Sequence, residues 1–284
     1  MLAGLVLCAV LAGVAGPEAS AWPGGLALGA ACLLLGLGAL GYVDAEPSRA
    51  LIAATAGFWG GASLIAAWLQ LAERSGRSPA ELRVDDLVIG VESGLGLLVC
   101  VAGAIVVLAW AYRPFAPEIL VAVVAAAGVM AIATTGHAAT GVWAPLLVGA
   151  HALAAAWWAG TLAALALTVR GRGGWARSLP GFSRYALVAV AVLTATGVLA
   201  ALGELGLSAD WVQTGYGRVV LAKAAVLVAA VMLAARHRRT WVPGAARHRT
   251  PEDVSLRRAV SETALLAVAL GLAAGLAATA PGVG

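Results

Sequence analysis

Long apolar runs recur along the whole chain of 284 residues, and they constrain the fold more than any other feature of the sequence. A helix of about 20 apolar residues crosses the roughly 30 Å of hydrocarbon in a bilayer. Hydrophobic residues make up 62% of the chain and charged residues only 11%, with a mean hydropathy of +0.93. Because a soluble domain carries about 25% charged residues, this composition predicts an integral membrane protein.

The apolar runs are continuous and rich in Ala, Leu and Gly, whereas a membrane barrel needs short segments of alternating polarity. We therefore expect an all-α fold, a polytopic transmembrane helix bundle of about nine spans. The first run lacks the basic n-region of a signal peptide, so we expect it to be retained; about eight spans remain if it is cleaved or not inserted. The expected spans are residues 2–16, 22–43, 50–71, 86–111, 117–135, 142–169, 184–203, 218–235 and 256–279.

Arginine collects in two expected loops, residues 170–184 and 236–258. The positive-inside rule predicts that both loops face the cytoplasm. Counting spans outward from them puts the N-terminus inside and the C-terminus outside. Contact of these arginines with membrane lipid explains the net charge of +4 and the pI near 9.3, so no nucleic-acid partner is expected.

The cysteines do not form a recognisable site. Cys8, Cys32 and Cys100 fall within apolar runs at unrelated spacings, so neither a disulfide framework nor a CxxC metal site is available. We expect all three to pack as small residues inside the bundle.

Several ionisable side chains fall at membrane depth, where insertion costs at least about 2.5–3.5 kcal/mol, so each is a functional hypothesis. Height can be measured from the cytoplasmic end of each helix at about 1.5 Å per residue. Four of these residues then reach one layer at the outer edge of the hydrocarbon: Glu92, His137, His151 and Glu204. This common height predicts a shared extracytoplasmic-side site. Lys223 and Glu262 lie below it, as a permeation route requires.

Structural interpretations of the same residues stay open. Glu92 and Glu204 can simply reach interfacial water and headgroups, and Lys223 can snorkel upward. Glu262 can pair with Arg258, four residues away on its own helix. The remaining supporting candidates are more readily explained by packing or by lining of a pore, and they are Met130, Trp157 and Trp158.

The second half of the chain resembles the copper-resistance D (CopD) domain family of bacterial inner-membrane proteins. The resemblance rests on the order and spacing of short segments rather than on any one of them. These segments are TGHA at 135–138, HALAAAWWAG at 151–160, FSRY at 182–185, TGV at 196–198, YGR at 216–218 before Lys223, Glu262 in the last span and AP at 280–281. Residues 1–115 share only their helical character with the family. We expect N-terminal helices over 1–115 and CopD-like helices over 116–284, within one membrane domain.

The resemblance implies copper transport or copper handling across the bacterial cytoplasmic membrane, beside a periplasmic CopC-type copper-binding partner. It marks His137 and His151 as the metal-linked residues, with a copper ion as ligand. Imidazole suits copper in both common oxidation states, and a thioether suits Cu(I). No catalytic residue is proposed, and the chain is not expected to be an enzyme.

Two other functions remain open at the level of sequence. Paired histidines on neighbouring helices also hold haem b, so a membrane electron-transfer protein is the first alternative. A membrane assembly or scaffold protein without a transported ligand is the second. A haem protein would purify with a Soret band, and a scaffold would tolerate the loss of both histidines.

Overall fold

The computed structural model describes residues 1–13, 16–83, 85–113, 116–134, 144–205 and 210–277. These residues form helices joined by short connections, without a strand among them. The α-helices are α1 (Leu2–Ala12), α2 (Ala21–Gly38), α3 (Arg49–Ser75), α4 (Asp86–Ala111), α5 (Ile119–Thr134), α6 (Ala144–Thr168), α7 (Gly171–Leu205), α8 (Asp210–Gln213), α9 (Gly215–Ala246) and α10 (Glu252–Ala277). Two 3-10 turns, η2 (Leu40–Val43) and η3 (Pro79–Glu81), lie in the connections after α2 and α3. The expected all-α fold is confirmed.

Within the described ranges, seven helices are long and apolar enough to cross a membrane: α2, α3, α4, α6, α7, α9 and α10. The other two apolar helices, α1 and α5, are shorter, with 11 and 16 residues. All nine lie where the sequence predicts spans. The chain is therefore a multi-pass helical membrane protein.

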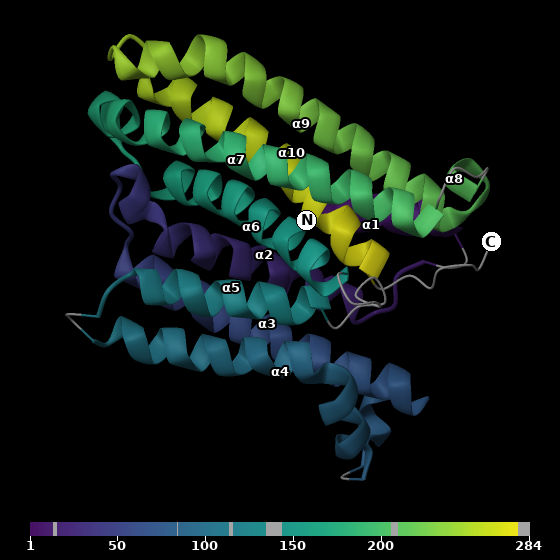
Figure 1. Cartoon of the computed structure of the whole chain (residues 1–284). Coiled ribbons are helices and arrows are strands. Elements are labelled where there is room, and N and C mark those ends of the chain that lie inside the picture. Colours follow the sequence, from purple (N-terminus) through teal and green to yellow (C-terminus); the bar gives the residue numbers. More distant parts are fainter. Residues whose placement is uncertain (14–15, 84, 114–115, 135–143, 206–209, 278–284) are drawn as a thin grey trace.

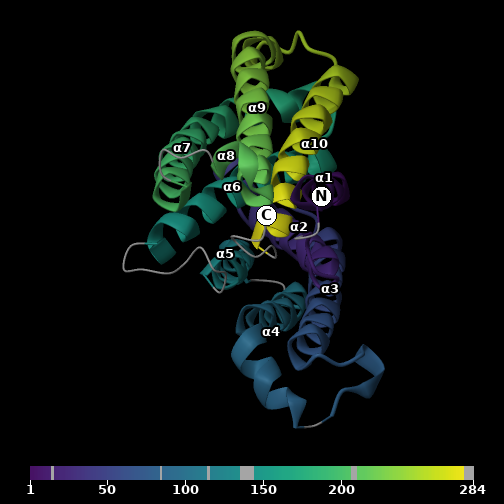
Figure 2. The same ribbon diagram turned by 90° about the vertical axis from the view of Figure 1, so that its right-hand side faces the viewer.

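The long helices lie side by side, and α2 occupies the middle of the bundle (Figures 1 and 2). It contacts α1, α3, α5, α6 and α10. Helices α3 and α4 pair along one flank, while α9 and α10 pair along the opposite flank. The C-terminal helices thereby join the rest of the bundle through α2 and α6.

Four connections meet at one end of the bundle, seen on the left of Figure 1: those after α2, α4, α6 and α9. An Arg49 Nη1 donates to the Arg113 carbonyl at 2.6 Å. The Ser178 hydroxyl donates to the Asp44 carbonyl at 3.2 Å. We call this the basic end, because both arginine-rich segments reach it.

The arginine-rich segments are mainly helical, whereas loops were expected. Helix α7 begins at Gly171 and α9 continues to Ala246, so only residues 169–170 and 247–251 connect helices there. These helices are longer than expected because their apolar faces extend past the expected spans. Trp175, Leu179 and Phe182 are buried at helical spacing in α7, and burial of such a stripe stabilises the helix beyond the hydrocarbon.

Helices α2 and α6 cross at two glycines. A Cβ atom on Gly160 would overlap the Cys32 carbonyl, and one on Gly36 would overlap the Gly160 backbone. Small residues at such crossings let helix backbones approach closely in a membrane, where packing rather than the hydrophobic effect drives association. This crossing fixes α6, and therefore His151, against the middle of the bundle.

We expect Gly160→Val to destabilise the protein by about 1–3 kcal/mol, because the added methyl groups force the α2 and α6 backbones apart. The measurement is the thermal unfolding midpoint of the purified protein in detergent. The matched control is Gly61→Val in α3, where an added Cβ meets no atom within 4 Å. Equal midpoints for the two variants would show that the crossing is not tightly packed.

Candidate functional site

His151 lies two turns into α6 and turns its ring toward α7. Its Nδ1 atom is 3.0 Å from the Thr196 hydroxyl oxygen. The His151 side chain is half-buried, and Thr196 is 8% exposed. The two residues therefore form a polar contact within the apolar part of the bundle.

The hydrogen bonds around Thr196 define the tautomer of His151. The Thr196 hydroxyl is 2.6 Å from the Val192 carbonyl, an acceptor to which it donates its single proton. It must then accept from His151, so Nδ1 carries the ring proton. Nε2 is left with its lone pair, which is the arrangement that a neutral metal-ligating histidine uses.

Glycine makes room around this histidine. A Cβ atom on Gly197 would lie 3.3 Å from His151 Cε1. Gly149 lies about half a turn before His151 in α6, and a Cβ atom there would lie 2.7 Å from Met130 Sδ. The Met130 thioether is thus packed over α6 two residues before His151, in the packing role that the sequence favours for a single methionine.

The other predicted members of the outer layer fall outside the described part of the structure. His137 lies in the segment 135–143, which the structure does not describe. Glu92 is in α4 and Glu204 is in α7, but neither side chain is described. Among described residues, no three His, Cys, Asp or Glu side chains are grouped to hold a metal ion. The convergence of the four residues on one site therefore stays a prediction.

A second polar cluster lies toward the basic end, where a buried carboxylate joins three helices. Glu262 of α10 is 3% exposed. His237 Nδ1 lies 2.8 Å from Glu262 Oε2, and the Trp158 indole N–H donates to Glu262 Oε1 at 3.2 Å. These contacts tie α6, α9 and α10 together. The interior location expected for Glu262 is confirmed, and its partner is His237 rather than Arg258.

Aromatic rings surround this cluster. Trp241 packs edge-on against His237 with ring centroids 5.3 Å apart, and its indole N–H donates to the Ser255 hydroxyl at 3.0 Å. Trp175 of α7 lies against the other side of Trp241, at 5.6 Å between centroids. Bulky rings thus exclude solvent around the carboxylate, which strengthens its hydrogen bonds.

Sequence reasoning missed His237 because the eighth span was expected to end at residue 235. With α9 extended, His237 belongs to the buried face that also carries Ala230, Trp241 and Ala245. Their spacing of seven, four and four residues is helical. That periodicity, running through a segment otherwise rich in arginine, was the signal available in the sequence.

The remaining candidates are placed as follows. Trp157 stacks on Phe182 at 5.8 Å and meets Tyr185 edge-on at 6.0 Å, so it packs α6 against α7. Trp158 is fully buried, and its indole N–H is the group that donates to Glu262. Lys223 of α9 is half-buried, and its predicted support of the bundle interior stays a prediction.

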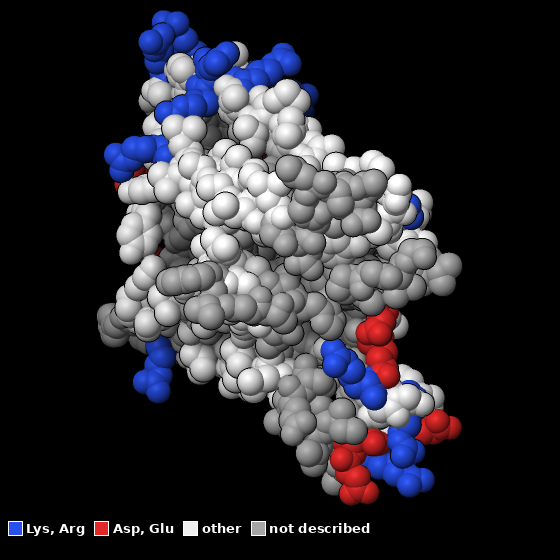
Figure 3. Space-filling model, turned by 45° about the vertical axis from the view of Figure 1, so that its right-hand side comes forward, with Lys and Arg blue, Asp and Glu red and all other residues white. Residues whose placement is uncertain are grey.

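Charge is distributed unevenly over the surface. Figure 3 shows Lys and Arg gathered at the top of the molecule, where α9 meets α10 in Figure 1. The lower end, near the connection between α3 and α4, mixes acidic and basic side chains. The basic end therefore has an excess of positive charge that the end near α3 and α4 lacks.

Comparison with known families assigns the C-terminal helices. Residues 176–276 match the family described as Copper resistance protein D. The match includes Thr196, Lys223, His237 and Glu262, whereas His137 and His151 precede it. Neither the curated proteins nor the solved structures compared with the chain give a match. The resemblance inferred from sequence is thus confirmed over residues 176–276, and the chain is a multi-pass membrane protein whose C-terminal third matches the copper resistance D family.

Proposed function

We propose that this protein carries copper across the bacterial cytoplasmic membrane, with His151 as a loading residue near the end of the bundle opposite the basic end. The observation that carries the proposal is the match of residues 176–276 to Copper resistance protein D. The matched region supplies Thr196, which contacts His151 directly. Copper is here the cargo of the protein and not a resident cofactor.

The chemistry of His151 supports this role. Its Nδ1 proton is committed to Thr196, so Nε2 is the ring atom that would meet copper. We propose that His137 joins it, since neighbouring helix axes lie about 8–10 Å apart and two inward-facing rings can reach one ion. Two imidazoles make a weak site, which suits a permease because the ion must also leave.

The path beyond His151 would pass the deeper polar residues. Lys223 lies on α9, and the cluster of His237 and Glu262 joins α9 to α10 nearer the basic end. Ionisable groups inside a membrane protein commonly mark ion or proton pathways. A CopC-type periplasmic protein would deliver or receive copper at the His151 end under this proposal.

Copper flux through proteoliposomes tests the proposed function. Purified full-length protein is reconstituted with a copper-sensitive dye inside the vesicles, and copper is added outside. We expect entry faster than in protein-free vesicles, and slower entry for His151→Ala. Entry no faster than the vesicle leak, with the protein correctly folded, would argue against a permease and for the scaffold alternative.

We also propose that the basic end faces the cytoplasm, because the arginine excess there is larger than at the opposite end. A single cysteine placed at exposed Arg249 should escape an impermeant thiol reagent in intact cells, while one at exposed Ser78 should react. The native Cys8, Cys32 and Cys100 are buried and give little background. If the cysteine at position 249 reacts and the one at position 78 does not, the basic end faces outward and the proposed topology is wrong.

A further inference from the structure

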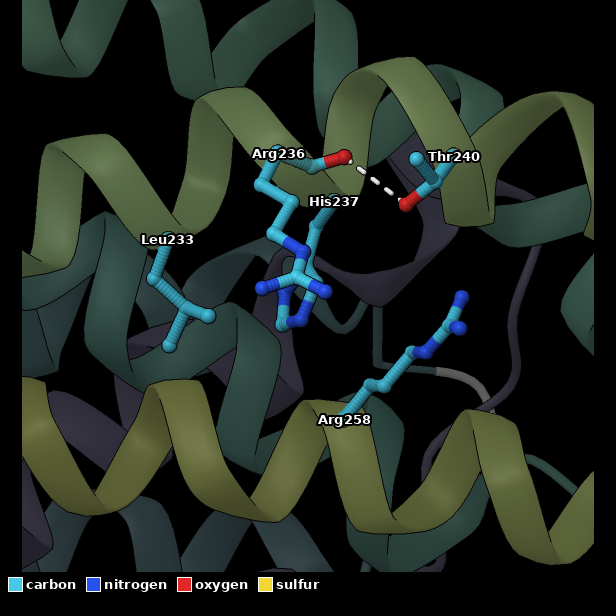
Figure 4. A pocket seen from close by; sticks show the side chains of 5 residues that line it. All are labelled: Leu233, Arg236, His237, Thr240 and Arg258. Atoms are coloured by element: carbon cyan, nitrogen blue, oxygen red, sulfur yellow. Dashed lines mark hydrogen bonds between the residues drawn. The ribbon is translucent and has the colours of Figure 1, made fainter.

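A cavity of about 330 Å³ lies at the basic end between α9 and α10. Leu233, Arg236, His237 and Thr240 line it from α9, and Arg258 lines it from α10. Figure 4 shows both guanidinium groups extending into the gap between the two helices, with the His237 ring behind Arg236. The cavity is therefore walled by positive charge.

Arg236 and Arg258 differ from Arg238 and Arg257, whose guanidinium groups have polar partners. Arg257 pairs with Asp253 on its own helix, and Arg238 donates to the Ser183 carbonyl. For the side chains of Arg236 and Arg258, the described part of the chain provides no hydrogen-bond or ion-pair partner. The nearby carboxylate of Glu262 is already shared by His237 and Trp158, so the positive charge of the cavity is uncompensated.

The remaining groups at the cavity suit an oxyanion. The Thr240 hydroxyl lies beside Arg236 and donates to the Arg236 carbonyl at 2.9 Å. A guanidinium presents planar, paired N–H donors that match the geometry of phosphate oxygens. Two such groups on neighbouring helices can hold one phosphate group from both sides. A cavity of this volume is at the lower limit for small-molecule sites, which fits a headgroup better than a nucleotide.

The surroundings of the cavity favour a phosphate group that is attached to lipid. Leu233 forms its apolar wall. Within about two turns on the same helices, Val228, Met232 and Val260 are 55%, 62% and 53% exposed. Acyl chains covering these side chains would place a headgroup at the level of the two arginines. Basic pockets between transmembrane helices commonly hold anionic headgroups in this way.

We propose that the cavity between α9 and α10 is a binding site for a phosphate-group anion, held by Arg236 and Arg258, with an anionic phospholipid headgroup as the favoured source. The cavity shares His237 with the proposed copper passage, but anion binding by Arg236 and Arg258 does not depend on copper transport. Its occupant would neutralise the two guanidinium groups and join the ends of α9 and α10.

The test measures binding of short-chain phosphatidylglycerol to the delipidated, purified full-length protein. Two double variants each remove two positive charges from the same helices. Arg236→Gln with Arg258→Gln changes the cavity, whereas Arg239→Gln with Arg257→Gln changes exposed arginines that do not line it. We expect about fivefold weaker binding for each cavity arginine lost, so roughly 25-fold for the cavity pair, and less than twofold for the control pair.

Three ligand arms identify the source of the anion. Saturable binding of phosphatidylglycerol that inorganic phosphate does not displace supports a lipid headgroup. Displacement by inorganic phosphate, with the same loss in the cavity pair, supports a free phosphate. Equal affinity for phosphatidylcholine, or equal losses in the two double variants, would overturn the proposal. If the cavity pair fails to fold, the single Arg236→Gln variant replaces it, because Arg236 is exposed.

Discussion

Glu262→Ala is expected to destabilise the protein by about 2–5 kcal/mol, because it removes packed side-chain volume and the hydrogen-bond acceptor of two buried groups. The substitution would leave the His237 ring and the Trp158 indole N–H without their acceptor inside the bundle. It would also leave a cavity where α6, α9 and α10 meet. The measurement is the free energy of unfolding of the purified protein in mixed micelles.

Two further variants separate the carboxylate from its bulk. Glu262→Gln keeps the shape of the side chain and one carbonyl oxygen that can accept from Trp158. It should therefore lower the free energy of unfolding clearly less than Glu262→Ala does. His237→Phe with Glu262→Leu replaces both polar members by apolar side chains and should recover much of the lost stability. Strictly additive effects of the two positions, or a Glu262→Ala variant as stable as the parent, would show that the cluster does not hold these helices together.

His137→Ala and His151→Ala are each expected to abolish most of the copper-dependent phenotype conferred by the protein, and the double variant should add little. The reason is that one ion needs both imidazoles, so the loss of either ring removes the site. The measurement is the copper content of cells and their growth at raised copper. Independent, additive losses would instead show two separate sites.

The hydrogen bond between His151 and Thr196 provides a second test of the role of His151. Thr196→Val removes the acceptor that fixes the Nδ1 proton, and loss of such an outer-sphere partner usually costs about 10- to 100-fold in metal affinity. His248→Asn changes an exposed histidine at the basic end, where asparagine tolerates the positive φ of 55°. The first change should weaken copper handling and the second should leave it intact.

The helical membrane fold was predictable because continuous apolar runs have few structural solutions in a bilayer. Helix ends were less predictable, as α7 and α9 show. Arginines at their basic-end turns suggested loops, yet buried Trp175 and Trp241 lie on the inner face of each extension. Tertiary packing on that face, rather than hydropathy, decides where these helices end.

The candidate site was predictable only in part. Glu262 was identified because a carboxylate in an apolar span needs a partner, but the partner could not be chosen from the sequence. Arg258 is four residues away in the same helix, whereas His237 is 25 residues distant and meets Glu262 only after α9 and α10 pack. Likewise, nothing in the local sequence of His151 indicates Thr196 as its partner 45 residues later.

Copper analysis of the purified protein tests the central claim most directly. The full-length chain is brought to equilibrium with copper by dialysis and compared with the variant carrying both His137→Ala and His151→Ala, while an absorption spectrum checks for haem. The account predicts protein-bound copper in the parent protein at equilibrium, no Soret band, and loss of the bound copper in the double variant. Equal copper in both proteins, with both folded, would contradict it.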